Sequence, residues 1–154
     1  MPAKSAMIVA VNERNLTVAG RVHAEAWQAS HRDFCSAAFV EKHTAAAQTD
    51  YLREQLRQGK QIFLLMEDTP VGLVSVHNSL IENLYVLPAL QNRGYGTQLL
   101  RYAIGQCREA PTLWLLSNNE GAYRLYSRHG FVKTGQVHRL NESLYEFEMQ
   151  HRTE

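Results

Sequence analysis

Short apolar runs and longer amphipathic stretches alternate along the chain, and this pattern predicts a mixed α/β structure. Runs rich in β-branched, aromatic and other large apolar residues, bounded by turn-forming residues, are typical of strands. They occur at residues 7–11, 62–67, 71–78, 80–87, 112–116, 132–137 and 144–149. The tripeptide Asp68-Thr69-Pro70 follows the second run and predicts a hairpin turn into the third.

Helical periodicity fills most of the intervals between these runs. Helices are predicted at residues 16–30, 36–58, 96–107 and 119–129, the second with a break near 43–49. Gly59 and Gly130 stand just after two of them, where a left-handed residue commonly ends a helix. The resulting order, β-α-α-β-β-β-α-β-α-β-β, predicts a mixed sheet with helices on its faces.

Length and composition fit one domain spanning residues 1–154. The 154 residues are 45% hydrophobic, enough for a core that needs neither disulfides nor a structural metal. A net charge of +1 disfavours nucleic acid as a partner. The longest apolar run, 62–66, is far shorter than the roughly 18 residues of a membrane span, and the N-terminus lacks a secretory signal. We therefore expect a cytoplasmic protein without a membrane partner.

Metal and disulfide chemistry find little support in the sequence. Cys35 and Cys107 are too few for a disulfide framework or a four-ligand zinc site, and we expect both to be buried free thiols. The seven histidines include no H-E-x-x-H pair and no tight cluster with Cys or Asp. We therefore expect no metal.

The segment 84–96, interpreted as strand, loop and helix start, carries the clearest chemical signal. Gly94 and Gly96 stand two apart where a helix begins, so the backbone there can approach a ligand closely. Free amides of the first turn and the positive end of the helix dipole favour a phosphate or pyrophosphate. Leu99 stands where a dinucleotide fingerprint needs its third glycine, and no G-K-[ST] follows. By itself, the glycine pair could also form only a tight strand-to-helix turn.

Two segments taken together carry a family resemblance. They are Gln91-x-x-Gly94-x-Gly96 and Asn119-x-x-Ala122-x-x-Leu125-Tyr126-x-x-x-Gly130-Phe131. In order and spacing they resemble the two signature segments of the GCN5-related N-acetyltransferase (GNAT) superfamily. In addition, Val22-His23-x-x-x-Trp27 is similar to the first helix of its small bacterial members. The resemblance implies an α+β fold with a mixed, mostly antiparallel sheet of about seven strands, helices on both faces and a splayed parallel pair at its centre.

The resemblance also implies a binding site for acetyl-CoA as co-substrate between residues 80–87 and 112–116. Backbone groups of Leu84 and Val86 would pair with the acetyl carbonyl and the pantetheine amides. The pyrophosphate would lie on main-chain amides of the loop and first helical turn, those of Gln91, Asn92, Arg93, Gly94, Tyr95, Gly96 and Thr97. The Asn119 side chain would reach the pantetheine arm, although 117–120 is equally well interpreted as a capping box in which Ser117 caps the helix.

Acetyl transfer from a thioester to an amine needs a neutral amine, stabilisation of the oxyanion and a proton for the departing thiolate. The resemblance assigns the proton donor to Tyr126, which could instead be a core tyrosine on the inward face of its helix. Leu80 stands where histone-type members carry a catalytic glutamate, a departure from the family pattern. Glu82, two residues later on the same strand face, is the candidate base, with His77 or a water relay as alternatives.

His23, Trp27 and His31 form one stripe on the first predicted helix. Relatives line the acceptor pocket with this helix, so Trp27 and His31, together with His77, are candidate substrate contacts. Packing of Trp27 in the core is an equally good interpretation.

The sequence therefore predicts an acyltransferase that moves acetyl from acetyl-CoA to the primary amine of a small molecule or peptide by direct attack on the thioester. The alternative among enzymes is a protein N-terminal or lysine acetyltransferase. A different class, a catalytically silent CoA-binding sensor, would keep the cleft without turnover. Aminoacyl-tRNA as acceptor is disfavoured by the near-neutral charge. The identity of the amine, the use of other acyl groups and a homodimeric assembly stay open.

Overall fold

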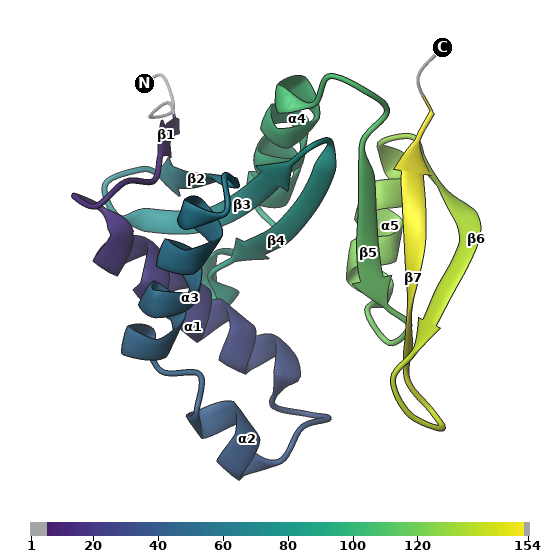
Figure 1. Cartoon of the computed structure of the whole chain (residues 1–154), viewed down its shortest axis with the longest axis horizontal. Helices are drawn as coiled ribbons and strands as arrows, with labels where there is room; N and C mark the ends of the chain where they lie inside the picture. Colours follow the sequence, from purple (N-terminus) through teal and green to yellow (C-terminus); the bar gives the residue numbers. More distant parts are fainter. Residues whose placement is uncertain (1–5, 153–154) are drawn as a thin grey trace.

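The computed structural model describes residues 6–152, in which helices flank one seven-stranded sheet (Figure 1). The strands are β1 (Met7–Ala10), β2 (Gln61–Met66), β3 (Pro70–His77), β4 (Leu80–Val86), β5 (Thr112–Leu116), β6 (Phe131–Arg139) and β7 (Tyr145–His151). The helices are α1 (Leu16–His31), α2 (Ala37–Glu41), α3 (Ala45–Arg57), the 3₁₀ helix η1 (Pro88–Leu90), α4 (Tyr95–Gln106) and α5 (Glu120–Arg128). The strand order in the sheet is β1-β2-β3-β4-β5-β7-β6.

β4 and β5 form the parallel pair of the sheet, and they stay together over only two residue pairs. Leu80 lies opposite Thr112 and Ile81 lies opposite Leu113, after which the strands diverge (Figure 1). The other neighbouring strands are antiparallel. The predicted mixed, mostly antiparallel sheet with a splayed parallel pair at its centre is therefore confirmed.

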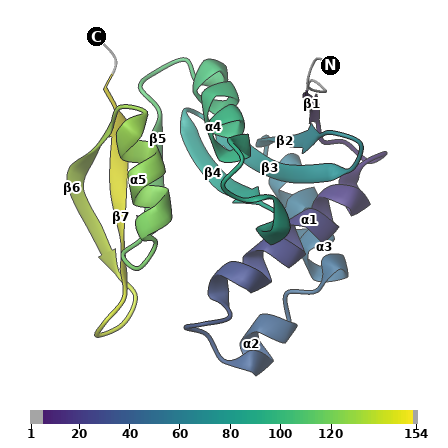
Figure 2. The ribbon, with the colours of Figure 1, turned by 180° about the vertical axis from the view of Figure 1, so that it is seen from behind.

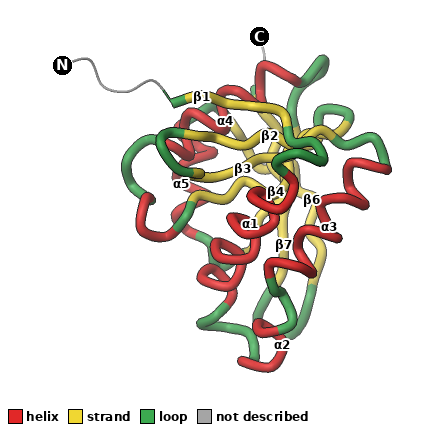
Figure 3. Tube along the Cα trace, turned by 90° about the vertical axis from the view of Figure 1, so that its left-hand side faces the viewer, coloured by secondary structure: helices red, strands yellow, loops and turns green. Residues whose placement is uncertain are grey.

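Helices cover both faces of the sheet. α1 and α3 pack on one face of the half formed by β1 to β4, whereas α4 packs on the opposite face (Figures 1 and 2). α5 lies on the same side as α4, against β5, β7 and β6 (Figure 2). Each layer has its own core: Leu16 and Leu52 belong to the core under α1 and α3, and Leu99 and Tyr126 belong to the core under α4 and α5. The strands change direction across the sheet (Figure 3), as the usual twist requires.

The elements occur in the predicted order, with ends shifted by a few residues. The break predicted in the second helical stretch falls at residues 42–44, between α2 and α3. It falls there because Thr44 caps α3, its Oγ1 accepting a hydrogen bond from the Ala47 amide at 3.1 Å. Gly59 and Gly130 have φ of 88° and 89°, the left-handed conformation predicted after a helix.

The two cysteines are free, but the prediction that they are buried was wrong, because both are only half-buried. Cys35 lies in the connection between α1 and α2, and Cys107 directly follows α4, so each stands where the chain leaves the core. Burial is still sufficient to raise the pKa of the Cys107 thiol. Between residues 6 and 152 no helix is long and apolar enough to cross a membrane.

α1 and α3 approach each other closely at Gly20. A Cβ at this position would overlap Thr49 Oγ1 and lie 2.8 Å from Thr49 Cα, so a larger residue collides with backbone as well as side chain. A rotamer change of Thr49 therefore cannot relieve the collision. This close approach also brings His23 of α1 next to Gln48 of α3.

We expect Gly20→Ala to lower the free energy of unfolding by about 1–3 kcal/mol, because overpacking outweighs the gain in helix propensity. The corresponding fall in Tm is roughly 2–10 °C for a chain of this size. Gly105→Ala in α4 is the matched control, because a Cβ there meets nothing within 4 Å. Thermal and urea unfolding measure the difference, and equal stability of the two variants would contradict the close-packing argument.

Candidate active site

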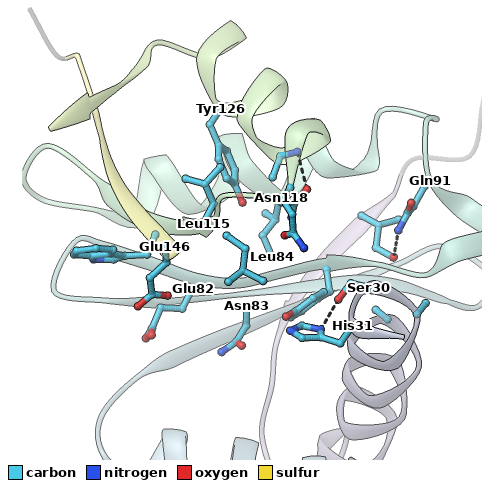
Figure 4. Close-up of a pocket in the computed structure, with 18 of the residues that line it drawn as sticks. Ser30, His31, Glu82, Asn83, Leu84, Gln91, Leu115, Asn118, Tyr126 and Glu146 are labelled. Carbon is cyan, nitrogen blue, oxygen red and sulfur yellow. Dashed lines mark hydrogen bonds between the residues drawn. The ribbon is translucent and has the colours of Figure 1, made fainter. Parts of the chain in front are cut away.

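A cleft of about 980 Å³ opens where β4 and β5 separate. Its walls come from α1, β4 from Ile81 onward, β5, α5 and β7 (Figure 4). Of the residues that the sequence singled out, those lining it are Glu82, Leu84, Val86, Gln91, Asn119, Tyr126 and His31. Concave sites of this size are typical of small-molecule binding.

The edge of β4 that faces the cleft offers backbone groups to a ligand. Leu87 donates its amide to Val71 of β3 at 2.9 Å, and successive residues of a strand direct their amides to opposite edges. Val86 therefore directs its backbone polar groups towards the cleft, and Leu84 lines the cleft beside it. Gln91 Nε2 donates to the Val86 carbonyl at 3.1 Å, which ties the following loop to this edge (Figure 4).

The loop before α4 exposes a series of backbone amides. Asn92 and Gly94 have φ of 64° and 88°, and α4 begins at Tyr95. In the described chain, none of the amides from Asn92 to Thr97 donates a hydrogen bond. A Cβ at Gly94 would meet nothing within 4 Å, so the positive φ, not crowding, favours glycine there. Successive free amides at a helix N-terminus form an anion-binding concavity.

Asn119 caps α5, which corrects the predicted capping box. Its Oδ1 accepts a hydrogen bond from the Ala122 amide at 3.1 Å. Ser117 was the cap in the alternative interpretation of this segment, but its Oγ accepts from the Tyr145 amide of β7 at 3.2 Å instead. The helix begins only at Glu120, two residues too late for a Ser117 cap. Asn119 nevertheless lines the cleft, and the cap does not use its Nδ2 group.

Tyr126 combines a core position with a hydroxyl in the cleft. Its ring packs on Phe131, with the centroids 5.8 Å apart, and only 7% of the residue is exposed. The hydroxyl points into the cleft towards Leu84 (Figure 4). Burial, with a smaller contribution from Tyr85, raises the pKa of Tyr126, so the hydroxyl stays protonated at neutral pH.

Tyr85 is a cleft residue to which the sequence assigned no role. Burial raises the pKa of its phenol to about 12, so it too is a neutral donor. Its position beside Leu84 in the chain could have indicated that it borders the cleft. Nothing in the sequence indicated that its ring would pack against α1. The Tyr85 ring lies edge-on to His23, at a centroid distance of 5.1 Å.

Carboxylates collect at one end of the cleft. Glu82 forms an ion pair with Lys60, with Oε1 and Nζ 3.0 Å apart. Glu146 of β7 and Asp33, from the connection after α1, line the same cleft, whereas no lysine or arginine of the described chain does. Figure 4 shows the Glu82 and Glu146 carboxylates at the same end. The sequence did not point to Glu146 and Asp33, because only the fold brings them to the lining of this cleft.

The residues of the predicted stripe on α1 have different surroundings: some line the cleft and others pack between helices. His31 lines the cleft, and its Nδ1 lies 2.9 Å from the Trp27 carbonyl. Trp27 is not among the lining residues; its indole is stacked between His31 and His43, at centroid distances of 3.9 and 3.5 Å. His77, at the end of β3, also lies outside the lining and contacts Asn78 Nδ2 at 3.3 Å.

His23 of α1 is buried between α3 and β4, with 1% of the residue exposed. Gln48 Nε2 lies 2.8 Å from its Nδ1, and Asn83 Oδ1 lies 3.2 Å from its Nε2. Burial lowers the pKa of His23 to about 4, so the imidazole is neutral at physiological pH. No group of three or more His, Cys, Asp or Glu side chains within residues 6–152 is arranged to hold a metal ion.

A cleft between two diverging parallel strands, with the free amides of a helix N-terminus beside it, is the arrangement of a class of proteins suited to an extended, anionic ligand. Comparison with known families identifies this class. The Acetyltransferase (GNAT) family model matches residues 24–131. The chain therefore belongs to the GNAT family of acetyltransferases.

Solved structures share the fold along nearly the whole chain. The PaiA N-acetyltransferase of Thermoplasma acidophilum in complex with coenzyme A is 18% identical, with a TM-score of 0.72 over 97% of this chain and 99% of that one. YncA, a putative acetyltransferase of Salmonella typhimurium with acetyl-CoA, is 17% identical, with a TM-score of 0.68 over 95% and 92%. A GNAT family acetyltransferase of Bacillus cereus is 15% identical, with a TM-score of 0.74 over 97% and 98%. No curated protein sequence matches the chain.

The lowered pKa of His23 predicts a stability change in mild acid. An unfolded histidine titrates near 6.5 and the folded one near 4, so the unfolded state binds more protons between these values. The contribution of His23 is complete above pH 6.5, falls as the pH drops to 4, and totals about 3 kcal/mol. We expect the stability difference between wild type and His23→Gln to shrink over this range in urea unfolding. Parallel pH curves would contradict the prediction.

Proposed function

We propose that the chain acts as one N-acetyltransferase domain, moving acetyl from acetyl-CoA to the primary amine of a small molecule or peptide. The observation that carries this proposal is the cleft between β4 and β5 with the free amides of Asn92 to Thr97 beside it. The coenzyme A and acetyl-CoA present in the two similar structures support it further.

The described residues fit acetyl-CoA along its length. The free amides from Asn92 to Thr97, including those of Arg93, Tyr95 and Gly96, would hold the pyrophosphate. Leu84 and Val86 would pair with the acyl and pantetheine groups as a neighbouring strand does. Asn119 Nδ2 would donate to the pantetheine arm. When bound, acetyl-CoA supplies the electrophilic thioester carbonyl.

Two groups of the chain would act at the thioester. The Leu84 amide would donate to the carbonyl oxygen as negative charge develops on it, a contribution that is strongest where water is excluded. The Tyr126 hydroxyl, protonated and aimed into the cleft, would give its proton to the departing thiolate. As the tetrahedral intermediate collapses, the acylated nitrogen would release its second proton, and the phenolate of Tyr126, whose phenol has a raised pKa, would take up this proton directly or through a water.

The carboxylate end of the cleft would receive the amine. Alkyl ammonium groups titrate near 10, so the acceptor arrives charged and must lose a proton before attack. Glu82 and Glu146, with no lysine or arginine among the lining residues, would attract the ammonium. Glu82, directly or through a water, would take the proton, while its ion pair with Lys60 holds the carboxylate in place. His31 would line the cleft on the side of α1.

The proposal is tested by measuring thiol release from acetyl-CoA with a panel of alkyl amines, amino acids and short peptides. Amine-dependent release with a matching acetylated product supports transfer, and the preferred acceptor separates small-molecule from peptide chemistry. Calorimetry on the same protein measures acetyl-CoA binding. Tight binding without turnover on any acceptor would favour a sensor, and absence of both would refute the proposal.

Gly96→Glu should weaken acetyl-CoA binding on the order of 10-fold or more, because it places a carboxylate beside the proposed pyrophosphate site. The variant should fold, since a Cβ at Gly96 meets only Leu125 Cδ2, at 3.4 Å. Gly105→Glu adds the same charge to the other end of α4 and is the matched control. Calorimetric titration with acetyl-CoA compares them, and an unchanged Kd for Gly96→Glu would remove the pyrophosphate from this turn.

Tyr126→Phe should lower kcat about 10²- to 10⁴-fold, the usual contribution of a general acid, with little change in the Kd of acetyl-CoA. Tyr123→Phe on the same helix is the control, because Tyr123 is 39% exposed and lies outside the lining. Steady-state kinetics with the preferred amine measures both variants. Turnover of Tyr126→Phe at the wild-type rate would assign proton donation to another group.

A further inference from the structure

β4 departs from regular strand geometry at Asn83, beside the cleft. Asn83 has φ of 54°, a left-handed conformation that residues other than glycine rarely adopt within a strand. The register between β3 and β4 shifts between Leu73 and Ser75, so one residue of β3 lies opposite two of β4. Those two, Asn83 and Leu84, form a β-bulge, which we call the β4 bulge.

Side chains from three different elements hold the Asn83 side chain. His23 Nε2 of α1 lies 3.2 Å from Asn83 Oδ1. Asn83 Nδ2 lies 3.2 Å from Tyr51 Oη of α3 and 3.3 Å from Ser75 Oγ of β3. Behind them, Gln48 Nε2 of α3 lies 2.8 Å from His23 Nδ1. His23 and Ser75 are 1% and 0% exposed, so water scarcely competes for the bonds that these two residues make, whereas Tyr51 is 38% exposed.

Every donor of this network faces an acceptor in only one arrangement of the protons. An amide nitrogen only donates, so Gln48 makes His23 Nδ1 an acceptor and leaves the imidazole proton on Nε2. That proton is donated to Asn83 Oδ1, and the amide protons of Asn83 are donated to the oxygens of Tyr51 and Ser75. A protonated imidazole would lose the bond from Gln48, so the network requires a neutral His23.

We propose that His23 and Asn83 are positioning residues that hold the β4 bulge in the conformation directing the Leu84 amide at the thioester oxygen. This inference rests on the proposed function. Neither side chain has to touch the reacting atoms, because both act through the backbone that leads into Leu84. Without the network, a residue with positive φ has little to keep it there, and a bulge that moves along β4 turns the Leu84 amide away from the cleft.

Two pairs of variants separate positioning from general loss of stability. His23→Leu removes the donor to Asn83, whereas His23→Gln keeps an amide donor at a similar reach. Gln48→Leu removes the outer donor of the network. Gln55→Leu is its matched control, since Gln55 lies two turns further along the same face of α3, is 8% exposed, and has an Oε1 without a hydrogen-bond partner in the described chain.

Three readouts on the full chain test the inference. They are kcat with the best amine of the panel, the Kd of acetyl-CoA, and the ¹³C resonance of enzyme-bound [1-¹³C]acetyl-CoA without amine, which reports the hydrogen bond to the carbonyl. For His23→Leu we expect kcat to fall about 10- to 100-fold while the Kd stays within about threefold. The carbonyl resonance should move towards that of free acetyl-CoA. His23→Gln should recover most of both changes.

A His23→Leu protein with wild-type kcat and a wild-type carbonyl resonance would overturn the inference and leave the proposed function intact. If His23→Leu does not fold, the comparison of Gln48→Leu with Gln55→Leu tests the inference instead. A fall in kcat and a shifted resonance in Gln48→Leu alone support the inference, and identical behaviour of Gln48→Leu and Gln55→Leu overturns it. A wild-type protein that neither binds nor turns over acetyl-CoA would overturn the proposed function, and this inference with it.

Discussion

The early separation of β4 from β5 is the constraint on which the site depends. Buried backbone amides and carbonyls need partners, and two parallel strands that pair only as far as Ile81 and Leu113 leave facing edges without them. Water or an extended ligand must supply those partners. The cleft therefore follows from the sheet topology itself, and the helices on either side decide only its length, its charge and the side chains that enter it.

The diverging strands are compatible with a stable fold because the packing around them is dense. Gly20 lets α3 lie against α1, which puts Gln48, His23 and Asn83 in one hydrogen-bonded series. That series ends on the residue whose left-handed backbone creates the β4 bulge. Strained backbone of this kind persists where its surroundings over-determine it, and it is concentrated at functional sites. The close helix contact and the shape of the cleft are thus parts of one arrangement.

The two ends of the cleft differ in electrostatic character. Free amides and the helix dipole favour anions at the beginning of α4, whereas the other end holds the carboxylates of Glu146 and of Glu82, the latter paired with Lys60. Under the proposed function, an anionic acyl donor and a cationic acceptor would enter from opposite ends and meet near Leu84 and Tyr126. The neutral phenol of Tyr126 suits this meeting point, because a buried charge there would disturb both ligands.

The sequence by itself determined the order of the elements, a helix start at the turn that holds Gly94 and Gly96, and the placement of Tyr126 and Asn119 on one motif. These depend on periodicity, glycine and capping preferences, which act over a few residues. Only the tertiary structure decided that Trp27 packs between histidines outside the cleft lining and that Glu146 joins Glu82 within it. Such contacts join residues far apart in the chain, so the packing of whole helices and strands sets them. Preferences that act over a few residues therefore cannot predict that packing.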